Sequence, residues 1–126
     1  MSSKGQQERL HLIGQTLFDK KGFNIFAIDV RGVSTLADYF IIAEGSSDKH
    51  AKALADSIVM TLKERDERPC HVEGLAEGDW VVLDYMDLVI HLFKPGMRDK
   101  YRLEELWHEG QIVDLNIVLS NERGCC

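Results

Sequence analysis

Residues 78–93 read GDWVVLDYMDLVIHLF, two apolar runs separated by Met86 and Asp87. Alternation at a period of two is typical of β-strands, so we predict a hairpin with these two residues as its turn. Pairing the strands about that turn places three pairs on one face, which we expect to pack against helices. The pairs are Tyr85 with Leu88, Leu83 with Ile90, and Val81 with Leu92.

The opposite face of the predicted hairpin is also mainly apolar. It pairs Trp80 with Phe93, Val82 with His91, and Asp84 with Val89. A second apolar face must be covered by another helix or by a partner, and we expect Asp84 and His91 to pair as diagonal neighbours. The turn type stays open, because methionine is poorly suited to a turn that requires positive φ.

Charge in this region has one sign. Between Pro69 and Phe93 the chain has five acidic residues and no lysine or arginine. The acids are Glu73, Glu77, Asp79, Asp84 and Asp87. Together with Trp80 and Tyr85 they suit a surface that binds a basic partner, since aromatic side chains supply affinity and charge steers association. The alternative is an ordinary sheet core with a solvated edge.

The segments on either side of the hairpin predict helices and further strands. Apolar spacing predicts a helix over residues 5–22 with Gly22 as its C-cap, and a second helix capped by Ser46 or Ser47. The apolar stripe of the second helix comprises Ala51, Leu54, Ala55, Ile58, Val59 and Leu62. Strands are expected at residues 23–30, 38–45 and 70–74, and a strand-like run begins at Asp114. A short helix after Phe93 would turn Leu103, Leu106 and Trp107 inward.

These elements predict a single α/β domain, a mixed β-sheet with flanking helices. We expect the domain to span residues 1–126, with a core from about residue 8 to 115 and a flexible tail at 116–126. At 126 residues and 44% hydrophobic composition, the chain is long enough to bury a core without disulfides or metals.

Composition narrows the class of function. The net charge of −6 repels phosphate, so we expect no direct specific nucleic-acid binding. No apolar run approaches the roughly 20 residues of a membrane span, and the polar start does not resemble a signal peptide. Three cysteines do not form a disulfide framework, and Cys70 is expected to be a buried or semi-buried thiol of a cytoplasmic protein.

Catalytic motifs are missing from the sequence. It contains no P-loop, dinucleotide fingerprint or zinc-protease motif, and its five histidines lack metal-ligand spacing, so we expect no cofactor or metal. One enzyme alternative is a Mg²⁺-dependent nucleotidyltransferase, with Gly45-Ser46 at a helix entry and two carboxylates for the metal. However, Asp84 and Asp87 are three residues apart across a turn, and Gly45-Ser46 is better explained as a helix N-cap.

Two longer stretches carry a family resemblance. DYFIIAEGSSDKHAKALAD at residues 38–56 and VEGLAEGDWVVLDYMDLVIHLFKPGMRDKYRLEELW at residues 72–107 resemble the ribosomal silencing factor, or Iojap-like, family. The resemblance runs from about Leu10 to Leu115. It implies a mixed α/β domain that is similar in shape to nucleotidyltransferases but lacks their catalytic residues, and therefore a protein that is not an enzyme.

The resemblance also implies a function. Family members bind ribosomal protein L14 (uL14) on the large ribosomal subunit and sterically block joining of the small subunit, which represses translation when nutrients are short. Relatives in organelles are linked to large-subunit assembly. Carried onto this chain, the partner-binding residues are Trp80, Asp84, Tyr85 and Asp87, with Lys94 and Arg98 as secondary candidates.

Two features qualify this site. Trp80 and Tyr85 point to opposite faces of the predicted hairpin, so both cannot be central to one flat interface. Family members often have glycine at the position of Met86.

A homodimeric scaffold without a ribosomal role is a further alternative, and a homodimer is also compatible with silencing.

Overall fold

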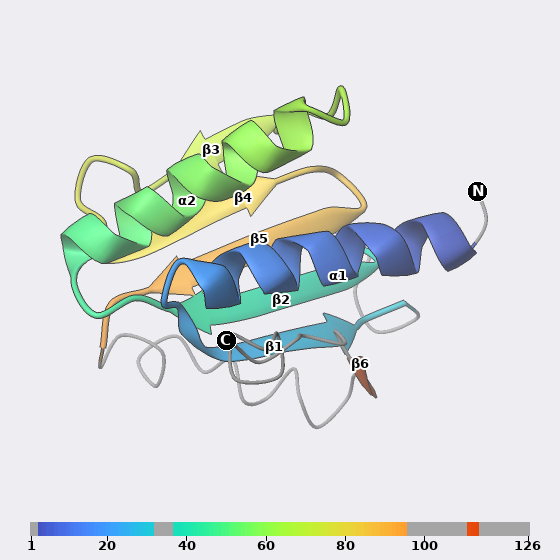
Figure 1. Cartoon of the computed structure of the whole chain (residues 1–126), viewed down its shortest axis with the longest axis horizontal. Helices are drawn as coiled ribbons and strands as arrows, with labels where there is room; N and C mark the ends of the chain where they lie inside the picture. Colours follow the sequence, from blue (N-terminus) through green and yellow to red (C-terminus); the bar gives the residue numbers. More distant parts are fainter. Residues whose placement is uncertain (1–2, 32–36, 96–110, 114–126) are drawn as a thin grey trace, which may run out of the picture.

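The computed structural model of the chain describes residues 3–31, 37–95 and 111–113 (Figure 1). The elements in chain order are α1 (Ser3–Asp19), β1 (Phe23–Asp29), β2 (Tyr39–Glu44), α2 (Asp48–Lys63), β3 (His71–Glu73), β4 (Trp80–Asp84), β5 (Leu88–Phe93) and β6 (Gln111–Val113). The described part of the chain therefore combines two helices with six strands.

All the described strands belong to one sheet, in the order β3-β4-β5-β2-β1-β6. Strands β2 and β5 pair in parallel, whereas every other neighbouring pair is antiparallel. Helices α1 and α2 lie on the same face of the sheet (Figure 1). The predicted α/β domain with a mixed sheet and packed helices is confirmed.

The predicted hairpin register is confirmed residue by residue. Trp80 pairs with Phe93 at the open end, and Asp84 pairs with Val89 next to the turn. The Tyr85 backbone N–H donates to the Leu88 carbonyl at 2.8 Å, which closes the turn. Alternation along β4 and β5 therefore gave the correct pairing, because a register shift of one residue would have moved every side chain to the other face of the sheet.

The two helices cover the larger of two apolar clusters. The helical members are Leu10, Ile13 and Leu17 of α1 and Ala51, Leu54, Ala55, Ile58 and Leu62 of α2, and all are at most 2% exposed. They pack on the hairpin face that carries Val81, Leu83, Leu88, Ile90 and Leu92, as predicted. Val59 is partly buried against the same cluster.

The second cluster lies on the opposite face of the sheet. It contains Ile28, Val30, Ala37, Phe40, Ile42 and Phe93, with Trp80 and Val89 packed against it. Strand β2 is buried along its whole length, because it lies between β1 and β5, and from Tyr39 to Ala43 it is apolar on both faces. Such continuous apolar strands are typical of a sheet that is covered on both sides.

Helix α1 ends earlier than the sequence predicted. It stops at Asp19, and the residue with left-handed backbone is Lys21, at φ 73°, rather than Gly22. The Gly22 N–H donates to the Leu17 carbonyl at 2.7 Å, and a Cβ at Gly22 would lie 2.9 Å from the same oxygen. Gly22 therefore does take part in the predicted C-terminal cap, one position beyond the left-handed residue Lys21, and its close approach to the Leu17 carbonyl favours glycine there.

Helix α2 begins with a side-chain cap. Ser47 has extended backbone, and its hydroxyl accepts the His50 N–H at 3.1 Å. Ser46 is not the cap, because its backbone N–H donates to the His50 ring at 2.8 Å. The other ring nitrogen of His50 lies 2.8 Å from the Lys20 carbonyl, which ties the start of α2 to the turn after α1.

Replacing Ser47 with alanine is expected to lower the free energy of unfolding by about 1 kcal/mol, since the His50 N–H loses its acceptor. Urea unfolding followed by circular dichroism measures this change. The matched variant Ser47→Asn supplies another acceptor and should stay close to wild type. An equal loss in both variants would contradict the capping role.

Other parts of the chain differ from the predictions or lie beyond them. Strand β1 ends at Asp29 and has an irregular register between Phe23 and Phe26, with Asn24 at φ 50°.

Cys70 is exposed, not buried, because it precedes the short edge strand β3. Strand β6 precedes the run predicted from Asp114. That run and the predicted helix with Leu103, Leu106 and Trp107 lie outside the described residues. Neither described helix is long and apolar enough to cross a membrane.

Candidate partner-binding surface on the β4–β5 hairpin

The predicted site residues fall at two ends of the hairpin. Trp80 lies at the open end of β4, whereas Asp84, Tyr85 and Asp87 surround the turn. From Trp80 to Met86 the strand advances six residues, which corresponds to about 20 Å. The structure therefore divides the predicted surface into an open end and a turn end.

At the open end, Trp80 is held in one orientation by aromatic neighbours. Its ring stacks on Phe93 with centroids 5.6 Å apart and on His91 at 5.8 Å. The Trp80 indole N–H donates to His91 Nδ1 at 3.1 Å. The residue is half-buried, and its ring is fixed by these contacts. An aromatic ring fixed in this way loses little conformational entropy when a partner binds.

His91 is buried beneath this tryptophan. Its ring also meets Phe40 edge-on, with centroids 5.2 Å apart, and burial lowers the pKa of His91 to about 4. Since Nδ1 accepts a hydrogen bond, the proton of the neutral ring lies on Nε2, and Nε2 has no hydrogen-bond partner among the described residues. The predicted pairing of His91 with Asp84 was wrong, because His91 instead accepts from Trp80.

At the turn end, the Asp84 carboxylate accepts the backbone N–H of Met86 at 2.8 Å. Asp84 is half-buried and forms no ion pair with a described residue. Tyr85 is buried, at 7% exposure, and burial raises the pKa of its hydroxyl to about 12. In this structure Tyr85 contributes to the core and has little surface to offer a partner. Trp80 and Tyr85 lie on opposite faces, as predicted.

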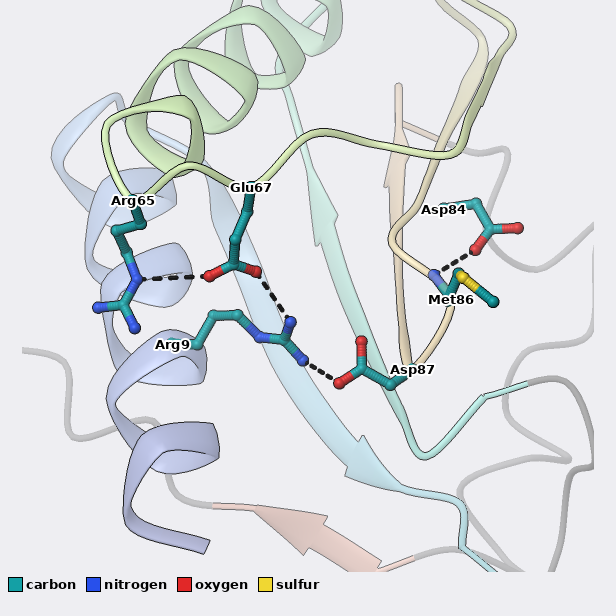
Figure 2. A network of polar contacts seen from close by, with 6 residues as sticks. All are labelled: Arg9, Arg65, Glu67, Asp84, Met86 and Asp87. Carbon is teal, nitrogen blue, oxygen red and sulfur yellow. Dashed lines mark hydrogen bonds and ion pairs between the residues drawn. The ribbon is translucent and has the colours of Figure 1, made fainter. Parts of the chain in front are cut away.

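Asp87 forms an ion pair with Arg9 of helix α1. Arg9 Nη2 lies 2.6 Å from Asp87 Oδ2, and Arg9 Nη1 lies 3.0 Å from Glu67 Oε1. Figure 2 shows the guanidinium between the two carboxylates, which come from the hairpin turn and from the segment after α2. Burial opposes the charge on Arg9, but the hydrogen bonds to Asp87 and Glu67 outweigh it and raise the pKa of Arg9.

Sequence reasoning did not identify Arg9. Arg9 lies four positions before Ile13, so it shares a side of α1 with the buried stripe. This spacing was the feature of the sequence that could have indicated a partly buried arginine. What the sequence could not indicate was its partner, because Asp87 is 78 residues away along the chain.

Several members of the acidic stretch already have a partner within the chain. Besides the Arg9–Asp87 pair, Lys94 Nζ lies 3.0 Å from Asp79 Oδ1, near the open end of the hairpin. Glu73 contacts the His71 ring at 2.6 Å. Lys94, predicted as a partner-binding residue, therefore already has an acidic neighbour. Arg98, the other secondary candidate, lies outside the described residues. Of the hairpin carboxylates, Asp84 is the one that has no ion pair with a described residue.

The two carboxylates considered for a metal point in different directions. Asp84 accepts from the Met86 backbone, whereas Asp87 binds Arg9 on the helix side of the turn (Figure 2). Within residues 3–31, 37–95 and 111–113, no three histidine, cysteine or acidic side chains gather in a way that could hold a metal ion. Ser47, not Gly45-Ser46, caps α2, which corrects the interpretation of that motif.

Comparisons with known proteins agree with the sequence resemblance. Residues 3–124 match a family model described as ribosomal silencing factor during starvation. The chain is 36% identical to the ribosomal silencing factor of Bacillus subtilis, over 91% of this chain and 98% of that protein. It is 31% identical to a mouse protein named for mitochondrial assembly of the ribosomal large subunit, over 82% of this chain and 46% of that protein.

The fold is also similar to a solved structure. The crystal structure of a Chromobacterium violaceum protein superimposes with a TM-score of 0.77 and 34% sequence identity. The match covers 94% of this chain and 98% of that chain. Fold and sequence therefore agree over almost the whole length of both proteins.

Proposed function

The chain belongs to the family of ribosomal silencing factors, and from this premise we propose that it represses translation by binding uL14 on the large ribosomal subunit. The bound protein sterically prevents the small subunit from joining. Family membership makes the chain a ribosome-associated regulator of translation; the identity of the contacted protein and the steric block are the proposal. Its setting is the cytoplasm under nutrient limitation.

The observation that carries this proposal is the fixed, half-buried Trp80. Its ring is held by Phe93 and by the hydrogen bond to His91, so a binding partner does not have to order it. Interface hot spots are enriched in tryptophan, and a fixed ring favours affinity. Trp80 therefore supplies an aromatic anchor at the open end of the hairpin.

Charge supports a basic partner. Asp84 is a carboxylate without an ion-pair partner among the described residues, on a chain whose net charge is −6. A basic protein surface would be attracted to it over about 8–10 Å at physiological ionic strength. The same charge disfavours direct contact with ribosomal RNA. We therefore place the contact on a protein component of the large subunit.

The mechanism needs no bond to be made or broken. A protein that occupies the intersubunit surface prevents docking by volume alone, so we assign no catalytic role and no cofactor. The relative named for large-subunit assembly in mouse mitochondria supports a second role for this chain in subunit maturation. Both roles use the same contact with the large subunit.

Binding to purified uL14 tests the proposal. We expect wild type to bind, Trp80→Ala to bind about 10- to 30-fold more weakly, and Asp84→Lys about tenfold more weakly. The control Asp56→Lys makes the same change of charge on the exposed side of α2 and should stay within about twofold of wild type. Circular dichroism confirms that each variant is folded.

The outcomes separate the parts of the proposal. Binding that neither Trp80→Ala nor Asp84→Lys weakens would move the site away from these two residues. A wild type that binds neither uL14 nor isolated large subunits would overturn the proposed function. A wild type that binds but leaves subunit joining unchanged in sucrose-gradient sedimentation would contradict the steric block.

A further inference from the structure

Met86 combines two unfavourable properties at the hairpin turn. It is 69% exposed, the highest value among the large hydrophobic side chains described as exposed. Its backbone φ is 75°, in the left-handed region where a side chain with a Cβ is disfavoured. Asp87 does not share the positive φ, so the turn places its strained residue first, where glycine is the usual choice.

The turn is held in this conformation from several sides. The Asp84 carboxylate accepts the Met86 N–H, and the Asp87 carboxylate binds Arg9, which also binds Glu67 (Figure 2). The Asp87 carbonyl accepts the backbone N–H groups of Asp38 and Tyr39, at 2.8 and 3.1 Å. Strained residues persist where surrounding contacts determine the backbone, and they are frequent at functional sites.

The Met86 side chain contributes little to the stability of the isolated chain. An exposed side chain buries little apolar area, and its Cβ disfavours the backbone that the turn requires. Glycine would adopt the same backbone without that cost. A flexible, polarizable thioether that projects from a rigid turn is well suited to fill an apolar recess on a partner.

We propose that Met86 is a partner-contacting residue, which inserts its side chain into an apolar recess on a basic protein. Asp84, which accepts the Met86 N–H, supplies the charge that pairs with lysine or arginine at the edge of that recess. This inference rests on the proposed function and extends its contact from Trp80 to the turn end. The partner is therefore uL14, contacted at both ends of the hairpin, about 20 Å apart.

A variant series at position 86 tests this assignment against uL14. Met86→Gly and Met86→Asn both tolerate positive φ but lack the apolar side chain, so we expect binding to weaken about five- to tenfold without a fall in Tm. Met86→Leu keeps an apolar side chain of similar size and should bind within about threefold of wild type.

Met60 provides a matched control. It is also a methionine with 68% exposure, but it lies on helix α2 with ordinary backbone. Met60→Ala should leave the affinity unchanged within about twofold, since single exposed apolar residues are common on protein surfaces. An equal loss from Met60→Ala would overturn a specific role for Met86.

The series also separates this inference from the proposed function. Wild-type binding that persists unchanged in Met86→Gly and Met86→Asn would overturn the assignment of Met86 and leave the proposed function standing. No binding by wild type would overturn both. A large fall in Tm for Met86→Gly would show that the side chain stabilises the fold, and this too would contradict the inference.

Discussion

Replacing Arg9 with methionine is expected to lower the free energy of unfolding by about 2–3 kcal/mol. The Arg9 side chain is 11% exposed and contacts two carboxylates, Glu67 and Asp87, which are themselves partly buried. Methionine keeps most of the apolar stem but removes the positive charge. The two carboxylates then lose their shared cation, and this uncompensated charge is the main cause of the expected loss.

Urea unfolding of wild type and Arg9→Met at pH 7 measures the loss. The matched control is Arg65→Met, which removes a contact with Glu67 at 3.5 Å from a side chain that is 39% exposed (Figure 2). Exposed ion pairs contribute about 0–1 kcal/mol, so this control should change little. If the two variants lost equal stability, the Arg9 network would have no special importance for the fold.

The partners of Arg9 give a second check. Removing both carboxylates with Glu67→Gln and Asp87→Asn in the Arg9→Met background should recover part of the lost stability, because no charge is then left unpaired. Failure to recover any stability would indicate that packing of the arginine stem, rather than charge, accounts for the loss.

Stability should also depend on pH through His91. Burial lowers the pKa of His91 to about 4, whereas an unfolded histidine titrates near 6.5. Between these values the unfolded chain binds more protons than the folded chain, so stability falls as the pH falls. The contribution of neutral His91 to the free energy of unfolding is fully present above pH 6.5. Between pH 7 and pH 5 we expect this residue to lower the free energy of unfolding by about 2 kcal/mol.

Urea unfolding at pH 7, 6 and 5 tests this expectation in wild type and His91→Gln. Glutamine does not titrate but still offers an oxygen to the Trp80 indole N–H. The variant therefore removes the titration of position 91 and keeps the hydrogen bond. The stability difference between the two proteins should shift by about 2 kcal/mol across this range. A stability difference that stays constant with pH would show that His91 has the same pKa in the folded and the unfolded chain.

Local patterns in the sequence were sufficient for several features. The alternation in β4 and β5 predicted both faces and the register of the hairpin, because the period of two leaves one pairing that buries both sets of side chains. The apolar stripe of α2 predicted its buried side for a similar reason. The longer motifs indicated the family, which the comparisons confirm.

Other features depend on contacts between distant segments. Asp87 and Asp84 are similar residues near one turn, yet one binds Arg9 of α1 and the other caps the Met86 backbone. Tyr85 is buried under the helices, and His91 accepts from Trp80 rather than pairing with Asp84. Helix α1 also ends earlier than predicted, at Asp19, and the left-handed residue that follows it is Lys21.

The difference has a physical origin. Periodicity reports which side of an element avoids water, and this depends on neighbours within a few residues. The partner of a charged or polar side chain depends on which elements the fold brings together, and Arg9 and Asp87 meet across 78 residues of chain. The alternation of residues 80–93 thus specified a hairpin, whereas tertiary packing determined which of its polar groups are engaged within the fold and which remain available to a partner.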